Sequence, residues 1–161
     1  MGRGSDGALS RTGGLYALVC TLPQAVTLPV GHLGEVAFPA GWYVYVGSAR
    51  GPGGFRARVG RHLRRAKRVR WHVDRLLAWA EVREVWGKAG EVPRECTWAT
   101  ALAQAPGACR WPPGFGASDC RCKGHLIALP EAPAAEAFRA LGAERLWPQD
   151  CTPEDFDNTL F

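Results

Sequence analysis

Residues 42–65 have the sequence "WYVYVGSARGPGGFRARVGRHLRR". An aromatic and β-branched run, typical of a strand, leads through a glycine- and proline-rich loop into a segment thick with arginine. Within that segment, Phe55, Val59 and Leu63 recur at i, i+4 and i+8, so that they form one apolar stripe. This pattern predicts a helix from about Gly54 to Lys67, placed directly after a strand.

Positive charge is concentrated in this helix and just beyond it. The sequence has no carboxylate between Glu35 and Asp74, while nine of the twenty lysines and arginines fall between positions 50 and 70. Such a block creates a local positive potential, whose commonest partner is a phosphate backbone. We therefore expect a nucleic acid, DNA in the first place, to be bound by Arg56, Arg61, Arg64, Arg65, Lys67, Arg68 and Arg70. The alternative is a solvated basic surface without a ligand.

The other strands and helices are expected to be short. An apolar run from Leu15 to Leu22 predicts a buried strand that could pair antiparallel with residues 42–47. The segments 82–86 and 125–130 predict two further strands, and the loop at 24–41 could hold another near Val36. Helices are expected within 71–82, 92–105 and 134–142, whereas glycine and proline exclude regular structure from 106–124. The expected fold class is α/β (α+β), with a small three-stranded antiparallel sheet flanked by helices.

The length and cysteine content indicate one domain. With 161 residues, the chain can bury a single modest core. We expect a flexible tail at 1–12, a folded domain at 13–130 and a C-terminal extension with a short helix at 131–161. No window is long and apolar enough for a transmembrane span, and the first residues lack the apolar core of a secretory signal. The six scattered cysteines fit a cytoplasmic protein with mostly reduced thiols.

Several short motifs resemble those of a known nuclease superfamily. "GLY" at 14–16 and "YVG" at 45–47 are similar to the two half-motifs of the GIY-YIG nucleases. "FRARVGRH" at 55–62 resembles the helix of that superfamily, in which an arginine is followed one turn later by histidine or tyrosine. "WHVDRLL" and "FGASDCRCKGHL" are similar to an uncharacterised branch that occurs alone or attached to DNA-repair enzymes. The resemblance covers about residues 13–129.

The resemblance implies a metal-dependent endonuclease that acts on DNA, in repair or recombination. Its catalytic residues would be Tyr16, Tyr45, Arg58, His62 and Glu95, and Glu95 would hold Mg²⁺ or Mn²⁺. Tyr16 would activate the attacking water as general base, and Arg58 would bind the scissile phosphate. Because an unperturbed phenol has a pKa of about 10, Tyr16 would need nearby cations to ionise at neutral pH.

Two departures from the superfamily keep a second class of function open. The family usually carries an asparagine beyond the metal-binding glutamate, but here none follows Glu95 before Asn158, so Gln104 and Asp119 are the remaining candidates. The loop "SARGPGG" is also longer and richer in glycine than the usual turn. The alternative is therefore a nucleic-acid-binding module, or a repair accessory module, without catalysis.

A cysteine-rich loop suggests a further, structural role. Cys120, Cys122 and His125, with Cys96 as a fourth ligand, could form a structural zinc site, although the C-x-C spacing is tighter than usual. The alternative is a set of buried thiols that brace an irregular loop. Trp71, which follows the basic segment, could stack on a nucleobase or belong to the core.

Overall fold

The computed structural model describes residues 9–64, 69, 71–116 and 123–148. In chain order the elements are β1 (Gly14–Leu22), β2 (Val26–Pro29), the short 3-10 helix η1 (Gly31–Leu33), β3 (Glu35–Phe38), β4 (Gly41–Ala49), α1 (Gly54–Leu63), α2 (His72–Leu77), β5 (Glu81–Ala89), α3 (Glu95–Leu102), β6 (Cys109–Arg110), β7 (Leu126–Leu129), α4 (Ala135–Arg139) and β8 (Glu144–Trp147).

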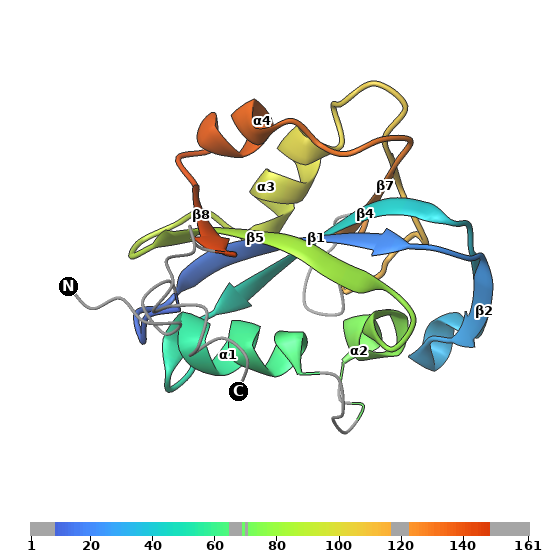
Figure 1. The fold of residues 1–161 in the computed structure, drawn as a ribbon, viewed down its shortest axis with the longest axis horizontal. Coiled ribbons are helices and arrows are strands. Elements are labelled where there is room, and N and C mark those ends of the chain that lie inside the picture. The colour runs from blue at the N-terminus through green and yellow to red at the C-terminus, as the bar shows by residue number, and fades with distance from the viewer. Residues whose placement is uncertain (1–8, 65–68, 70, 117–122, 149–161) are drawn as a thin grey trace, which may run out of the picture.

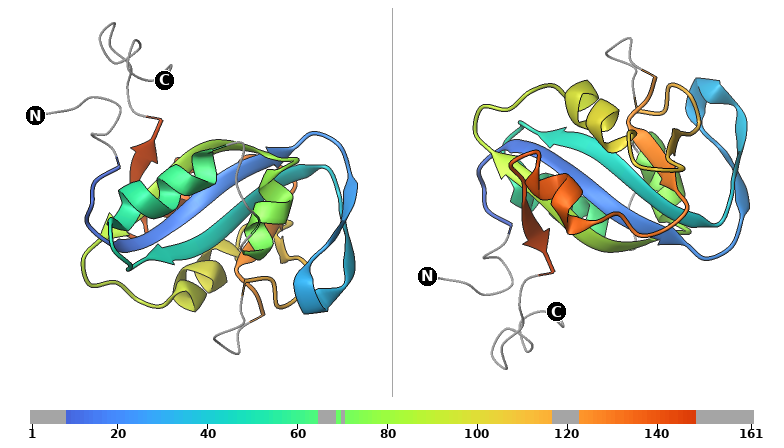
Figure 2. Two further views of the ribbon diagram at one scale, coloured as in Figure 1. Left: turned by 90° about the horizontal axis from the view of Figure 1, so that it is seen from below. Right: turned by 90° about the horizontal axis from the view of Figure 1, so that it is seen from above.

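A six-stranded antiparallel sheet forms the centre of the molecule (Figure 1). Its strand order is β6-β7-β4-β1-β5-β8, and every neighbouring pair is antiparallel. The strands β2 and β3 form a separate two-stranded sheet at one end of the main sheet (Figure 2). Helices α1 and α2 lie on one face of the main sheet, and α3 and α4 lie on the other. The result is a helix–sheet–helix sandwich.

The central strand β1 is apolar throughout because both faces of the sheet are covered. Successive side chains of a strand point to opposite faces. Leu18 and Leu22 therefore enter the core beside α1 and α2, whereas Leu15 and Val19 enter the core beside α3 and α4. This double burial explains why the run has no polar alternation.

The start of α1 is fixed by the chain that precedes β1. Gly54 has φ +54°, and a Cβ atom there would lie 2.1 Å from the carbonyl oxygen of Thr12. The N–H of Phe55 donates to that carbonyl at 2.9 Å, and the N–H of Arg56 donates to the carbonyl of Ser10 at 2.8 Å. Two of the N–H groups that a helix start leaves unsatisfied are thus paired, and α1 is held against the end of β1.

The expected small three-stranded sheet is wrong, because further strands extend both of its edges. The strands β1, β4 and β5 pair at the centre as predicted, but β7 pairs with the other edge of β4, β6 pairs with β7, and β8 pairs with β5. An uncovered strand edge leaves backbone donors and acceptors without partners, and these added strands satisfy them. No sequence pattern predicts β6 or β8, since β6 has two residues and β8 has four without alternation.

Other boundaries also differ from the sequence-based expectation. In the segment 24–41, expected as a loop with a further strand near Val36, that strand is present as β3, while β2 and η1 are additional. Helix α1 ends at Leu63 rather than Lys67, because Arg64 adopts an extended backbone (φ −74°, ψ 137°). The expected C-terminal extension contributes α4 and β8. In the part of the chain that the structure describes, no helix is long and apolar enough to cross a bilayer.

The core beside α3 gives a direct test of this architecture. Trp98 is only 1% exposed, so Trp98→Ala is expected to lower the free energy of unfolding by about 3–5 kcal/mol through the cavity that it leaves. Trp79 is 57% exposed, so the control Trp79→Ala should change it by about 0.5 kcal/mol or less. Urea unfolding followed by circular dichroism measures both, and equal losses would contradict the burial of α3.

Candidate active site

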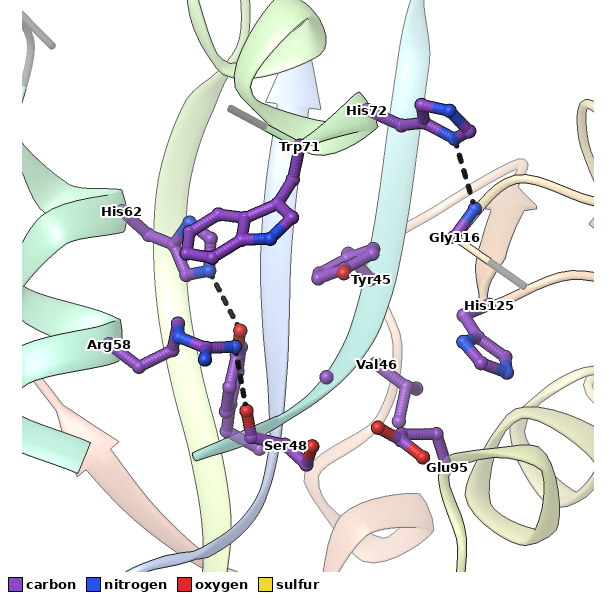
Figure 3. Close-up of a pocket in the computed structure, with 12 residues that line it drawn as sticks. Tyr45, Val46, Ser48, Arg58, His62, Trp71, His72, Glu95, Gly116 and His125 are labelled. Atoms are coloured by element: carbon purple, nitrogen blue, oxygen red, sulfur yellow. Dashed lines mark hydrogen bonds between the residues drawn. The ribbon is translucent and has the colours of Figure 1, made fainter. Parts of the chain in front are cut away.

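A polar pocket of about 440 Å³ lies at the edge of the sheet, where α1, α2 and the start of α3 approach β4 (Figure 3). Its wall includes all five residues that the sequence predicts as catalytic, although they come from four different elements. The full lining consists of Tyr16, Tyr45, Val46, Gly47, Ser48, Arg58, His62, Trp71, His72, Glu95, Gly116 and His125.

The pocket exists because β4 is longer than its partner β7. The paired register of these strands ends at Tyr45 opposite Leu126, and the N–H of Val46 donates to the carbonyl of His125 at 2.9 Å. Helix α3 also contacts β4. Glu95, in the first turn of α3, therefore lines the same pocket as side chains from α1, although the two helices cover opposite faces of the sheet.

Tyr16 is held between β4 and α1. A hydrogen bond of 2.7 Å joins its Oη to Nε2 of His62. In the β1–β4 register Tyr16 lies opposite Gly47, where a Cβ atom would lie 2.6 Å from the tyrosine Oη. The glycine of the "YVG" motif thus leaves room for the phenol to cross β4 and reach His62.

Arg58 points across β4 toward the carboxylate side of the pocket (Figure 3). Its Nη1 donates to the carbonyl oxygen of Ser48 at 2.9 Å. Its guanidinium carbon lies 4.5 Å from the ring centroid of Trp71, within the range of a cation–π contact. A backbone carbonyl and an aromatic ring therefore orient this cation.

Both tyrosines of the pocket keep their protons at neutral pH. Burial raises the pKa of Tyr16 well above its ordinary value, and neighbouring Tyr45 raises it further, while Arg58 acts in the opposite direction. Burial likewise raises the pKa of Tyr45 to about 12, against the lowering effect of Arg58. The nearby cation thus does not outweigh the loss of hydration, and Tyr16 is a neutral phenol in this structure.

Glu95 is ionised. Burial acts to raise its pKa, but hydrogen bonds from its own N–H and from the Ser48 hydroxyl, with the nearby charges of His125 and Arg50, bring the pKa below its ordinary value. The pocket therefore has a cationic side at Arg58 and an anionic side at Glu95.

The donor set around Glu95 suits a hard cation held largely by water. Within the described residues, no group of three or more His, Cys, Asp or Glu side chains is placed to hold a metal ion. Mg²⁺ commonly binds proteins through one or two carboxylates and keeps several waters, which a single ionised Glu95 in an open polar pocket allows. Of the zinc candidates, Cys120 and Cys122 lie outside the described residues, and His125 Nε2 lies 3.5 Å from Cys96 Sγ.

The expected nucleic-acid contacts divide into three groups. Arg56 and Arg64 are exposed on α1 and at its end. Arg61 instead binds the Asp74 carboxylate with both of its terminal nitrogens, each at 2.9 Å. The remaining members of the expected set lie outside the described residues: Arg65, Lys67, Arg68 and Arg70.

Of the two candidate substitutes for the family asparagine, Gln104 does not line the pocket. Gln104 is exposed, and its Nε2 donates to the carbonyl of Thr100 in the preceding turn. Asp119 lies outside the described residues.

Several lining residues were not assigned to the site from the sequence. Ser48 has no motif of its own, Gly116 is part of the "FGASDC" motif without a predicted role, and the sequence suggests His125 as a zinc ligand instead. His72 Nδ1 accepts a hydrogen bond from the N–H of Gly116 at 3.4 Å, so the "WHVD" and "FGASDC" motifs meet at this wall (Figure 3). Of the four histidines in the chain, three line the pocket and the fourth, His32, packs on His72. Only the folded chain brings them together.

Fold and site together define a three-layer domain, built on an antiparallel sheet, with a polar pocket at the sheet edge. The family model described as "Domain of unknown function DUF123" matches residues 15–146, so the chain belongs to that family. No curated protein and no solved structure matches the chain.

Gly47 should tolerate no side chain. Gly47→Ala is expected to displace the Tyr16 ring and to lower the free energy of unfolding by about 1–3 kcal/mol, as overpacking of a core does. Gly60→Ala is the matched control, since nothing lies within 4 Å of a Cβ atom at that position of α1 and alanine favours a helix by about 0.5–1 kcal/mol. Thermal and urea unfolding measure both; a stable Gly47→Ala protein would refute the close contact.

Alkaline titration tests the state of the tyrosines. The chain has three, and burial raises the pKa of each: Tyr43 and Tyr45 to about 12, and Tyr16 well above its ordinary value. As pH rises past about 10, the unfolded chain loses phenolic protons that the folded chain keeps, so the free energy of unfolding falls. Absorbance at 295 nm should therefore rise together with unfolding, above pH 10. A phenolate that forms at lower pH in the folded protein would identify an activated tyrosine.

Proposed function

We propose that this protein is a metal-dependent endonuclease of the GIY-YIG type, which hydrolyses phosphodiester bonds in DNA. The observation that carries the proposal is the meeting of Tyr16, Tyr45, Arg58, His62 and Glu95 in one pocket. These residues are spread over most of the chain, and they are the same five that the motif resemblance selects. The proposed setting is cytoplasmic, with a DNA-repair protein as a partner.

Arg58 would bind the scissile phosphate. A guanidinium presents paired N–H donors that match two phosphate oxygens, and its fixed charge offsets the charge that develops on the phosphate during attack. The hydrogen bond to the Ser48 carbonyl and the contact with Trp71 hold the group in place before the ligand arrives. Little reorganisation is then needed during the reaction.

Tyr16 and His62 would carry the proton away from the attacking water. Because burial keeps Tyr16 neutral, it cannot act as a preformed phenolate base. Its hydrogen bond to His62 Nε2 offers a relay instead: the phenol oxygen accepts a proton from water while its own proton passes to a neutral imidazole. The phenol stays uncharged, and the positive charge ends on His62.

Glu95 would supply the anionic side of the site. It would hold Mg²⁺ or Mn²⁺ together with water, and a bound cation of this kind supplies further neutralisation of the phosphate and of the leaving oxygen. Hydrogen bonds from its own backbone N–H and from the Ser48 hydroxyl hold the pKa of the carboxyl below its ordinary value and keep it ionised. Tyr45 lies near enough to Arg58 and Glu95 for both charges to act on its pKa, and it would border the bound phosphate as a neutral donor.

Exposed arginines on α1 and at its end would hold the DNA backbone. Arg56 of α1 and Arg64, which directly follows the helix, are exposed, and contacts of this kind give affinity and salt dependence without sequence preference. Arg61 is a poorer candidate, since Asp74 already neutralises it.

A binding module without catalysis is the second candidate. Two observations favour it: the lining of the pocket contains no asparagine, and the described residues hold no cluster of three metal-ligating side chains. In such a binding module, Arg58 and the exposed arginines would bind DNA, and Glu95 would have no role in catalysis.

A cleavage assay decides between the two. Plasmid, single-stranded, flap and branched DNAs would be incubated with the protein and Mg²⁺, Mn²⁺ or chelator. We expect metal-dependent cleavage, with rates about 10²–10³-fold lower for Arg58→Ala and Glu95→Gln, the size found when a group that stabilises the transition state is removed. Arg83→Ala is the matched control, because Arg83 forms an exposed 3.5 Å pair with Glu81 on β5, outside the pocket.

The alternative gives a different pattern. Salt-sensitive DNA binding without cleavage of any substrate, weakened by Arg58→Ala and unchanged by Glu95→Gln, would reject the nuclease and establish the binding module.

A further inference from the structure

Trp71, which directly precedes α2, packs against two arginines of α1. The guanidinium carbon of Arg58 lies 4.5 Å from its ring centroid, and that of Arg61 lies 4.4 Å away. His62 of the same helix also contacts the ring, with 5.9 Å between the ring centroids. One indole therefore contacts three polar side chains of α1.

The indole is itself held by a buried carboxylate. Asp74 accepts two hydrogen bonds of 2.9 Å from Arg61, and its Oδ2 also accepts one of 3.0 Å from the backbone N–H of Trp71. The Asp74 side chain is fully buried and that of Arg61 is 14% exposed, so water competes little for this pair. Trp71, Arg61 and Asp74 thus form a closed unit, here called the tryptophan clamp, that joins α2 to α1.

The two arginines that contact Trp71 have different partners. Arg61 is paired with a carboxylate, and its charge is neutralised where it lies. Arg58 has neutral partners: the carbonyl of Ser48, the Tyr16 phenol and the face of the indole. Partners of this kind restrict the direction of a guanidinium while leaving its full charge for an anion. A carboxylate in place of the indole would hold Arg58 equally well but would compete with phosphate.

We propose that Trp71 is a positioning residue for Arg58, and that the Arg61–Asp74 pair serves to fix Trp71 rather than to bind DNA. This proposal rests on the proposed function only for the part that concerns catalysis. The orientation of Arg58 by Trp71 is a property of the protein alone. It assigns a role to the tryptophan and the aspartate of the "WHVD" motif, two residues that the proposed reaction does not use directly.

Nuclear magnetic resonance tests the orientation without any substrate. In the ¹⁵N-labelled protein, the Arg58 Nε–Hε signal, assigned with Arg58→Lys, should have the high order parameter of a fixed side chain. Trp71→Leu should lower this order parameter, whereas the control Trp79→Leu should leave it unchanged. An Arg58 signal whose order parameter does not fall in folded Trp71→Leu would overturn the proposal, whether or not the protein cleaves DNA.

A double-mutant cycle tests the effect on catalysis. Trp71→Leu should lower kcat about tenfold, which corresponds to the loss of one partly desolvated cation–π contact, with little change in KM; Trp71→Phe should restore most of the rate. In an Arg58→Ala background, Trp71→Leu should have no further effect, since coupled residues are not additive. Equal tenfold losses in both backgrounds would show that Trp71 acts on folding or on the substrate directly, and would reject the positioning role.

The two experiments separate the possible failures. If no DNA is cleaved while the Arg58 signal depends on Trp71, the proposed nuclease fails and the clamp stands as a device that orients Arg58. If DNA is cleaved while the signal is independent of Trp71, the nuclease stands and the positioning role fails. Circular dichroism of each variant confirms that the comparison is made between folded proteins.

Discussion

The pairing of β1 with β4 is the constraint on which the site depends. Its register sets Tyr16 opposite Gly47 and Leu18 opposite Tyr45, so both tyrosines point to the face covered by α1. A shift of one residue would turn every side chain of a strand to the other face, which would bury Tyr16 beside α3, away from His62. The apolar side chains of β1, which fill a core on each face, oppose such a shift. Packing in the two cores thus fixes the position of the polar groups.

The protonation states of Tyr16 and Glu95 depend on how burial, hydrogen bonds and nearby charges balance at each side chain. Burial keeps Tyr16 protonated despite the adjacent Arg58, while hydrogen bonds keep Glu95 ionised despite burial. The balance differs because burial outweighs the charge and the hydrogen bond of Arg58 at Tyr16, whereas at Glu95 the backbone N–H and the Ser48 hydroxyl outweigh burial. A buried acid ionises where the donors that face its charged form offset the loss of hydration.

The sequence predicted the central strands and the pocket residues better than it predicted the extent of the sheet. Strands such as β1 and β4 have long apolar or aromatic runs, and motif spacing drew attention to Tyr16, Arg58 and Glu95. The strands β6 and β8 are too short to carry a period, and they form because β7 and β5 offer open edges. Nothing local marks Ser48 either, since its role comes from its place on β4. Likewise, the charge run suggested DNA contact for Arg61, but only the fold brings Asp74 beside it.

The two sides of the pocket belong to different layers of the molecule. Arg58 and His62 are attached to the helix layer on one face, Glu95 to the layer on the other, and β4 passes between them. The span from cation to carboxylate is therefore set by the thickness of a hydrogen-bonded strand, which cannot stretch as a loop can. The distance between Arg58 and Glu95 is then the same in every ligand complex. The site would select ligands by the size of the group that bridges these two side chains, and changes in the length of the surrounding loops would not alter that distance.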